Sequence, residues 1–98
     1  MGSAEPKPWR FRLYVVGGHV GSARAEPDLR QALDACVPDA YQLEVIDLSA
    51  RPDLAQADQV IAAPTVIRLD TEPQRRAVGS LRSPLAVSDA LGLPPRAA

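Results

Sequence analysis

YQLEVIDLSARPDLAQADQVIAAPTVIRL, residues 41–69, is the most informative stretch of the chain, because it holds two strand patterns on either side of a short helix pattern. Residues 41–48 are dominated by apolar side chains, which predicts a central strand covered on both faces of its sheet. Pro52 favours the first turn of a helix over residues 52–57, since an amide at that position has no intrahelical partner to lose. Residues 65–69 are rich in β-branched side chains and predict a second strand.

The segment before this stretch predicts a strand followed by a helix. Residues 11–16 form a strand pattern that ends at two glycines, and Ser22 is the predicted helix cap. Pro27 interrupts the helical run, so the helix either begins at Pro27 or kinks there, and Pro38 ends it. The apolar residues of this helix fall on one stripe, made of Leu29, Ala32, Leu33, Cys36 and Val37. A helix between two strands predicts a right-handed parallel crossover.

The segment after this stretch predicts a hairpin and a last helix. Residues 70–73 have a turn composition between the strand at 65–69 and a weaker strand near 76–78, which predicts an antiparallel pair. Ser83 and Pro84 predict a helix start, and Gly92 predicts its end. The core positions expected on this helix are Leu85, Val87 or Ala90, and Leu91. The predicted fold class is therefore α/β with the thioredoxin-like order βαβαββα, a mixed sheet with helices on both faces.

Length and composition indicate one domain. The chain has 98 residues, of which 46% are hydrophobic, and we expect the domain over residues 9–93, a disordered N-terminus over 1–8 and a frayed tail over 94–98. The formal net charge of -1 argues against a nucleic-acid-binding protein, which usually carries a basic excess. No apolar run is long enough to cross a membrane and the N-terminus lacks a signal-peptide core, so a cytoplasmic protein is expected.

Reactive side chains are scarce in this sequence. Cys36 is the only cysteine, so neither an intramolecular disulfide nor a cysteine-based metal cluster is expected, and its place on the apolar stripe favours a packing role. The loop after the first strand, where thioredoxin-type enzymes carry cysteines, has none, which excludes dithiol chemistry there. His19 is favoured as a solvated loop residue over a metal ligand, and Asp47 would need a second polar group to act as a base or ligand. No catalytic residue, metal or cofactor is expected.

Arginines form the densest basic region of the chain. Arg68, Arg75 and Arg76 are expected to lie close together in the predicted hairpin. Such a cluster is either a solvated face or a contact surface for an acidic protein. The residues alone leave both interpretations open.

Five segments resemble the KaiB family, the small partner proteins of the cyanobacterial circadian clock, and the KaiB-like domain of the histidine kinase SasA. They follow one another in the family's order between about residues 11 and 93. The segments are LYVVG at 13–17, YQLEVIDL at 41–48, PDLA at 52–55, QVIAAPT at 59–65 and PQRRAVG at 73–79.

The resemblance implies a protein that acts by binding and not by catalysis. KaiB-like proteins dock on KaiC, a ring-shaped ATPase, recruit KaiA and displace SasA. A KaiC-like ATPase is therefore the expected partner, with KaiA or a SasA-type histidine kinase as further partners. The family has two folds: a ground state of order βαββααβ that forms dimers or tetramers, and a thioredoxin-like monomer that binds KaiC.

The resemblance also assigns site residues by position. The expected partner-binding residues are Arg24, Arg68 and Arg75, joined by Arg76 from the same basic region. Pro64 corresponds to the proline that is cis in thioredoxin-like folds, and Pro73 stands where the family carries consecutive prolines, so both are candidate cis prolines and switch hinges. Thr71 and Glu72 depart from that proline pattern, and such departures in the C-terminal half predict that the thioredoxin-like fold is favoured.

Two other classes of function stay open at this point. One is a redox-enzyme relative of the glutaredoxin or peroxiredoxin type, or a small-molecule binder that uses the His19 loop. The other is an orphan sensor domain that binds a histidine kinase and differs from the adaptor only in its partner.

Overall fold

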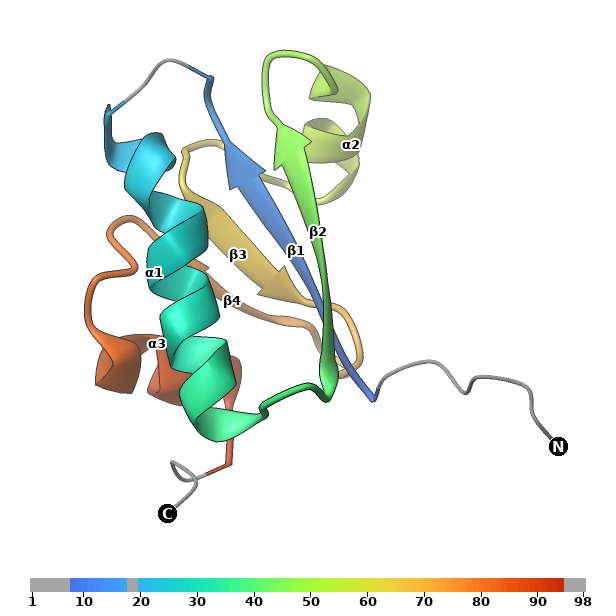
Figure 1. Ribbon diagram of the computed structural model, residues 1–98. Helices are drawn as coiled ribbons and strands as arrows, with labels where there is room; N and C mark the ends of the chain where they lie inside the picture. Colours follow the sequence, from blue (N-terminus) through green and yellow to red (C-terminus); the bar gives the residue numbers. More distant parts are fainter. Residues whose placement is uncertain (1–7, 18–19, 95–98) are drawn as a thin grey trace, which may run out of the picture.

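A computed structural model describes residues 8–17 and 20–94 of the chain and shows seven helices and strands in sequence (Figure 1). They are β1 (Trp9–Val15), α1 (Val20–Cys36), β2 (Tyr41–Asp47), α2 (Pro52–Ala57), β3 (Thr65–Arg68), β4 (Arg75–Val78) and α3 (Pro84–Leu91). The predicted order βαβαββα is confirmed, and the alternative order βαββααβ is not the one adopted. The expected disordered ends fall almost wholly on residues 1–7 and 95–98, which lie outside the described residues, so the domain limits at 9 and 93 stay predictions.

The four strands form one mixed sheet in the order β2-β1-β3-β4. β1 pairs with β2 in parallel, from Trp9 opposite Tyr41 to Val15 opposite Asp47, which confirms that the two strands run in the same direction, as predicted. β3 pairs antiparallel with both β1 and β4, which confirms the predicted hairpin.

β2 lies at the edge of the sheet, so the prediction of a central strand covered on both faces is wrong. Ile46 is the one residue of β2 that is buried. The apolar side chains of β2 contribute to the cores on both faces of the sheet, but most of them are only partly covered. The central positions of the sheet are occupied by β1 and β3.

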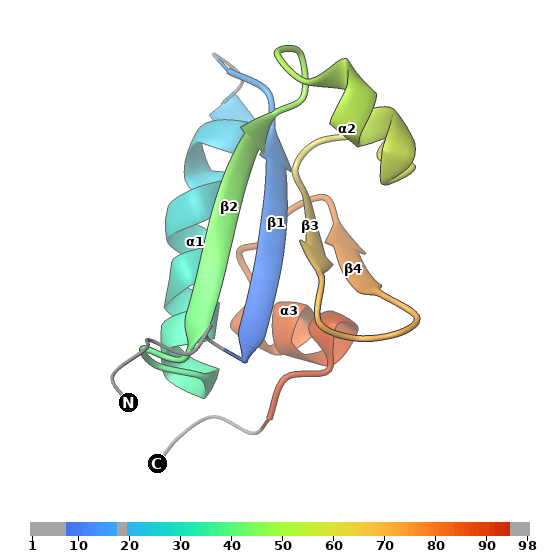
Figure 2. The same cartoon turned by 90° about the vertical axis from the view of Figure 1, so that its right-hand side faces the viewer.

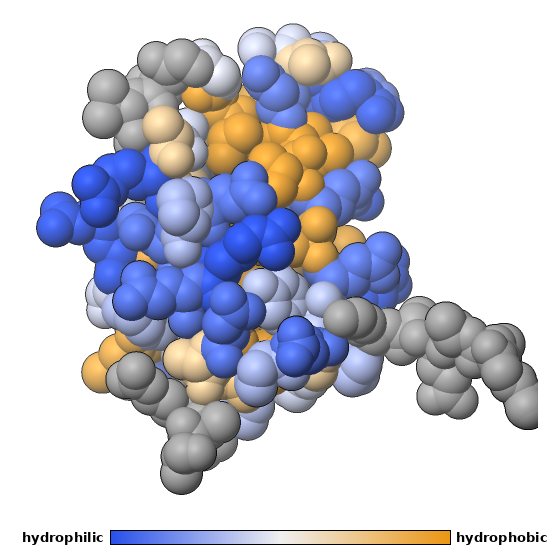
Figure 3. Space-filling view, in the orientation of Figure 1, coloured by the Kyte–Doolittle hydropathy of each residue, from blue (hydrophilic) through white to orange (hydrophobic). Residues whose placement is uncertain are grey.

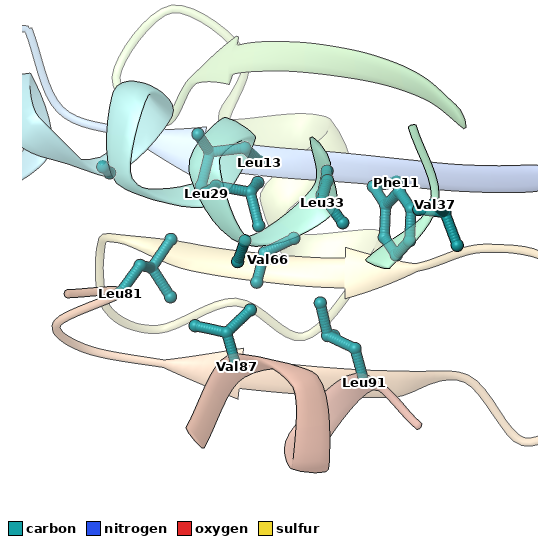
Figure 4. Packing of buried hydrophobic residues seen from close by; sticks show 11 residues of the cluster. Phe11, Leu13, Leu29, Leu33, Val37, Val66, Leu81, Val87 and Leu91 are labelled. Carbon is teal, nitrogen blue, oxygen red and sulfur yellow. The ribbon is translucent and has the colours of Figure 1, made fainter. Parts of the chain in front are cut away.

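Helices cover both faces of the sheet, as predicted, but unequally (Figure 2). α1 and α3 lie together on one face and enclose the larger core, in which Val87 and Leu91 of α3 point toward Val66 of β3 (Figure 4). α2 covers one end of the opposite face. The smaller core there consists of Tyr14, Ile46, Ala55, Val60 and Ile67.

α1 starts earlier than either predicted start. The helix runs through Pro27 from Val20, so a helix that begins at Pro27 is ruled out. Ser22 is not the cap, because it lies inside the first turn, where its buried hydroxyl oxygen accepts a hydrogen bond of 3.0 Å from the backbone N–H of Val16. The serine therefore satisfies the amide that follows β1 and not an amide of its own helix.

α3 follows its local signals. Ser83 caps it by accepting a 3.2 Å hydrogen bond from the amide of Ala86, Pro84 occupies the first turn, and Gly92 ends it in the left-handed conformation with φ 65°. Val87 and Leu91, four residues apart, face the core. Leu85, which was expected in the core, is 73% exposed because it lies on the opposite side of the same helix.

Gly92→Ala is expected to lower the free energy of unfolding by about 1–2 kcal/mol, the usual cost of a side chain in the left-handed conformation. A Cβ atom at this position would also lie 2.8 Å from Nε of Arg75, so that side chain would have to move. The matched control is Gly79→Ala: at φ 93° it also carries backbone strain, but its Cβ would meet no atom within 4 Å, so a larger loss in Gly92→Ala reports the displacement of Arg75. Urea unfolding of both variants checks the prediction. A Gly92→Ala variant as stable as the unmodified chain would contradict it.

Candidate partner-binding surface

The predicted arginines do not form a single cluster. Arg68 and Arg75 are paired across β3 and β4, so their side chains share the sheet face that α3 covers. Arg76 is the next residue along β4 and therefore points to the opposite face, where α2 lies. Arg24 sits near the start of α1, and α1 runs in the same direction as β3, so Arg24 lies toward the start of β3 and away from Arg68 at its end (Figure 1).

Arg68 points into the fold, where its guanidinium makes hydrogen bonds, an ion pair and a cation–π contact. Its guanidinium donates 3.0 Å hydrogen bonds to the carbonyl oxygens of Leu91 and Gly92 at the end of α3. It forms an ion pair of 3.0 Å with Asp70 and lies 4.3 Å from the ring centroid of Trp9. With only 12% of its side chain exposed, Arg68 has little surface to offer a partner in this conformation.

Arg76 is also used within the fold, whereas two of the predicted arginines face outward. The guanidinium of Arg76 donates to the carbonyl oxygens of Asp58, at 2.7 Å, and Gln59, at 3.2 Å, at the end of α2. Arg24 and Arg75 are exposed, and neither makes an ion pair or side-chain hydrogen bond with the described residues. They are therefore the arginines of the predicted set whose charges are free for a partner.

The two candidate prolines lie in loops on either side of β3. The peptide bond between Ala63 and Pro64 is cis, and so is the bond between Glu72 and Pro73. Pro64 is buried, and its carbonyl oxygen accepts a 2.8 Å hydrogen bond from the amide of Gly79. Their role as switch hinges stays a prediction.

The outer edge of β2 is open in the described part of the chain, because β1 is the strand's one neighbour in the sheet. An edge strand of this kind presents unpaired backbone N–H and C=O groups that another chain can pair with. Beside it, Val45 is 40% exposed. Figure 3 shows an apolar area between α1 and α2, on the side of the molecule where β2 lies.

A family model described as the KaiB domain matches residues 12–92, which is most of the chain. The chain belongs to the KaiB family. This confirms the resemblance on which the partner assignments depend.

Three curated relatives show how close the KaiB match is. Each is named circadian clock oscillator protein KaiB. The protein from Prochlorococcus marinus strain MIT 9313 is 39% identical over 75 residues, which cover 76% of this chain and 63% of that protein. The strain MIT 9312 protein is 37% identical, with 80% and 74% covered, and the Parasynechococcus marenigrum protein is 37% identical, with 76% and 72% covered. The matched part of the chain thus spans a little under two thirds of the first relative's length.

Solved structures show that this KaiB-family chain has the thioredoxin-like fold. The N-terminal domain of Synechococcus elongatus SasA superimposes with a TM-score of 0.68 at 14% identity, covering 91% of this chain and 84% of that domain. Mitochondrial thioredoxin 3 from Saccharomyces cerevisiae superimposes with a TM-score of 0.69 at 16% identity, covering 88% and 78%. At such identities the likeness shows the fold alone.

The single cysteine of this KaiB-family chain is poorly placed for thioredoxin-type chemistry. Cys36 is the last residue of α1, and it is half-buried, with its Sγ 4.0 Å from the hydroxyl oxygen of Ser88. Thioredoxin-type enzymes carry their thiols at the amide end of a helix, and Cys36 lies at the other end of α1. Cys36 opens on a groove of about 490 Å³ between α1 and α3, whose apolar lining includes Ala35, Pro84, Leu85 and Leu93.

Asp47 has a local structural role at the end of β2. Its Oδ1 accepts hydrogen bonds from the backbone amide, at 2.9 Å, and from the hydroxyl, at 2.6 Å, of Ser49. These bonds lower the pKa of Asp47. The polar group that converges on Asp47 is therefore a neighbour in its own turn, which gives no base or ligand pair.

The described residues contain neither a metal-binding cluster nor a membrane-spanning helix. Within residues 8–17 and 20–94, no three His, Cys, Asp or Glu side chains gather closely enough to hold a metal ion. His19, and with it the suggested ligand loop, lies outside the described residues. Among the helices that the structure describes, none has both the length and the apolar character needed to span a bilayer.

Sequence reasoning missed a polar cluster under α2. Asp58, at the end of α2, accepts a 2.6 Å hydrogen bond from the hydroxyl of Tyr14 and forms a 2.9 Å ion pair with Arg12. Arg12 also pairs with Glu44 of β2 at 2.9 Å. The strand pattern places Arg12 and Tyr14 on one face, with Leu13 on the other. Because β1 is a central strand, the buried polar groups of Arg12 and Tyr14 need hydrogen-bond partners on that face. Nothing in the sequence pointed to Asp58.

Tyr14 is expected to titrate well above an ordinary tyrosine. Its burial, followed by the hydrogen bond to Asp58, raises the pKa of Tyr14 to about 12. The folded state therefore binds the phenol proton more tightly than the unfolded chain, so this stabilisation is complete below pH about 10 and is lost as the pH rises through about 12. NMR titration of tyrosine ring carbons measures it. Asp58→Asn should lower the pKa of Tyr14 toward the ordinary value, and a Tyr14 that titrates near pH 10 in the unmodified chain would contradict the assignment.

Proposed function

We propose that this chain is a non-enzymatic KaiB-type adaptor that binds a KaiC-like ATPase ring in the cytoplasm and modulates its signalling or clock output. Membership of the KaiB family and the names of its relatives support this function. KaiA or a SasA-type histidine kinase would be further partners. The N-terminal domain of SasA has the same fold, which supports the idea that such proteins compete for one docking position.

The observations that carry the proposal are exposed groups suited to contact, which lie at opposite edges of the sheet and not in one patch. Arg24 and Arg75 hold exposed charges that no described residue neutralises, and the edge of β2 offers unpaired backbone groups beside Val45. Charges of this kind steer a partner and set specificity, while the strand edge and apolar area supply contact area. The one thiol lies at the wrong end of its helix for thioredoxin-type catalysis.

A pull-down with a purified KaiC-type ATPase tests the proposal. We expect the unmodified chain to be retained, and Arg75→Glu and Arg24→Glu to reduce binding by about tenfold or more, because a reversed charge opposite an acidic partner costs several kcal/mol. The matched control is Arg82→Glu, which reverses another exposed arginine, one outside the predicted set. Failure of the unmodified chain to bind would reject the adaptor function, and equal losses in all three variants would reject the assignment of Arg24 and Arg75 to the contact.

A further inference from the structure

α3 is attached to the rest of the fold by a small apolar contact. Val87 and Leu91 are the helix's buried hydrophobic residues, and they pack against the core formed with α1 and the sheet (Figure 4). The other side of α3 is exposed, including Leu85 at 73%. Elements with few buried side chains are the ones that open locally while the rest of a domain stays folded.

The C-terminal end of α3 is held by Arg68. The guanidinium bonds the carbonyl oxygens of Leu91 and Gly92, two of the groups that a helix end leaves without intrahelical partners. Its positive charge also complements the negative end of the helix dipole. One side chain of β3 therefore connects the end of α3 directly to the sheet.

The guanidinium is itself fixed by two other segments. Asp70, in the turn after β3, pairs with it and also accepts a 2.9 Å hydrogen bond from the backbone amide of Arg10. The Trp9 ring at the start of β1 lies over the guanidinium. A planar group that stacks and donates in several directions at once is the chemistry of arginine, which lysine does not reproduce.

We propose that α3 opens and closes as a unit on an otherwise intact sheet, and that Arg68 is the latch that holds it closed. Opening breaks the two carbonyl contacts, leaves the guanidinium with Asp70 and Trp9, and uncovers the apolar side chains on which Val87 and Leu91 rest. The role of Arg68 in binding rests on the adaptor function proposed above. Arg68 is a positioning residue that affects partner binding by fixing α3, while the outward-facing Arg75 makes the contact.

Amide hydrogen exchange on the isolated chain tests the latch. Arg68→Gln should speed exchange of the amides of α3 and of the turn that ends it, such as those of Val87 and Leu93, by about tenfold or more. The amides of β1 and β2 should keep their rates, and the fluorescence of Trp9, the only tryptophan, should change. Arg82→Gln, which removes a charge at the other end of α3, should do neither. Unchanged α3 exchange, or an equal rise throughout the sheet, would overturn the proposal.

A disulfide lock separates positioning from contact. The Sγ of Cys36 in α1 and the Oγ of Ser88 in α3 are 4.0 Å apart, so Ser88→Cys places a second thiol within reach of the first. In the Arg68→Gln chain, oxidation should restore slow α3 exchange and also restore binding to the ATPase, and reduction should reverse both. Restored exchange without restored binding would show that Arg68 is a contact residue. Because exchange is read without a partner, failure of the unmodified chain to bind would count against the adaptor function alone.

Discussion

Asp58→Ala is expected to destabilise the domain by about 2–4 kcal/mol, between the value of a hydrogen bond to a charged group and that of a broken buried ion pair. The substitution leaves the hydroxyl of the fully buried Tyr14 without its acceptor and removes one of the two carboxylates that neutralise Arg12. Arg12 keeps Glu44, which limits the loss. The free energy of unfolding of a small domain is only about 5–15 kcal/mol, so the expected loss is a large fraction of it.

Asp53→Ala is the matched control, because Asp53 is an aspartate of the same helix that pairs with an arginine at the surface. Its ion pair with Arg51 spans 3.1 Å, but the two side chains are 66% and 52% exposed. Such pairs contribute about 0–1 kcal/mol. Urea unfolding of both variants gives the comparison, and equal losses would mean that the Asp58 cluster is no stronger than a surface pair.

Leu33→Ala is expected to cost about 2–5 kcal/mol, because it opens a cavity in the larger core. Leu33 is 0% exposed and packs between α1 and the sheet face that α3 completes. Leu85→Ala is the matched control: it makes the same change in a helix at a side chain that is 73% exposed, where about 0.5 kcal/mol or less is expected. Thermal and urea unfolding measure both, and a Leu85→Ala loss as large as that of Leu33→Ala would contradict the assigned core.

The elements with strong local signals were predictable from the sequence. The start of α2 at Pro52, and the cap and end of α3 at Ser83 and Gly92, depend on backbone groups within one turn, so the residues that decide them are neighbours in the chain. The parallel pairing of β1 and β2 was predictable because two neighbouring strands joined by a helix are almost always parallel, with a right-handed connection.

Features that depend on distant partners were not predictable in the same way. The edge position of β2 results from β3 pairing with β1, which the apolar run of β2 does not encode. Pro27 and Ser22 carried helix-start signals, yet the helix begins before both, and the Ser22 hydroxyl bonds the backbone amide that follows β1 instead of capping the helix. Tertiary contacts of this kind override local preference.

The arginines show the same limit at the candidate site. The hairpin pattern placed three of them near one another in sequence, but strand alternation sends Arg76 to the other face. Arg68 and Arg76 donate hydrogen bonds to carbonyl oxygens at the ends of α3 and α2, so their guanidinium groups are not available to a partner. Those helix ends come to the sheet only through packing, so sequence spacing does not reveal that Arg68 and Arg76 are occupied and that Arg24 and Arg75 are not.

We propose that this chain acts through surface contacts with a partner and not through a reactive side chain. The most direct test is the dissociation constant for a KaiC-type ATPase, measured by titration calorimetry with the unmodified chain, Cys36→Ser and Arg75→Glu. We predict unchanged affinity for Cys36→Ser and affinity about tenfold or more weaker for Arg75→Glu. Loss of binding in Cys36→Ser with full affinity in Arg75→Glu would contradict the claim.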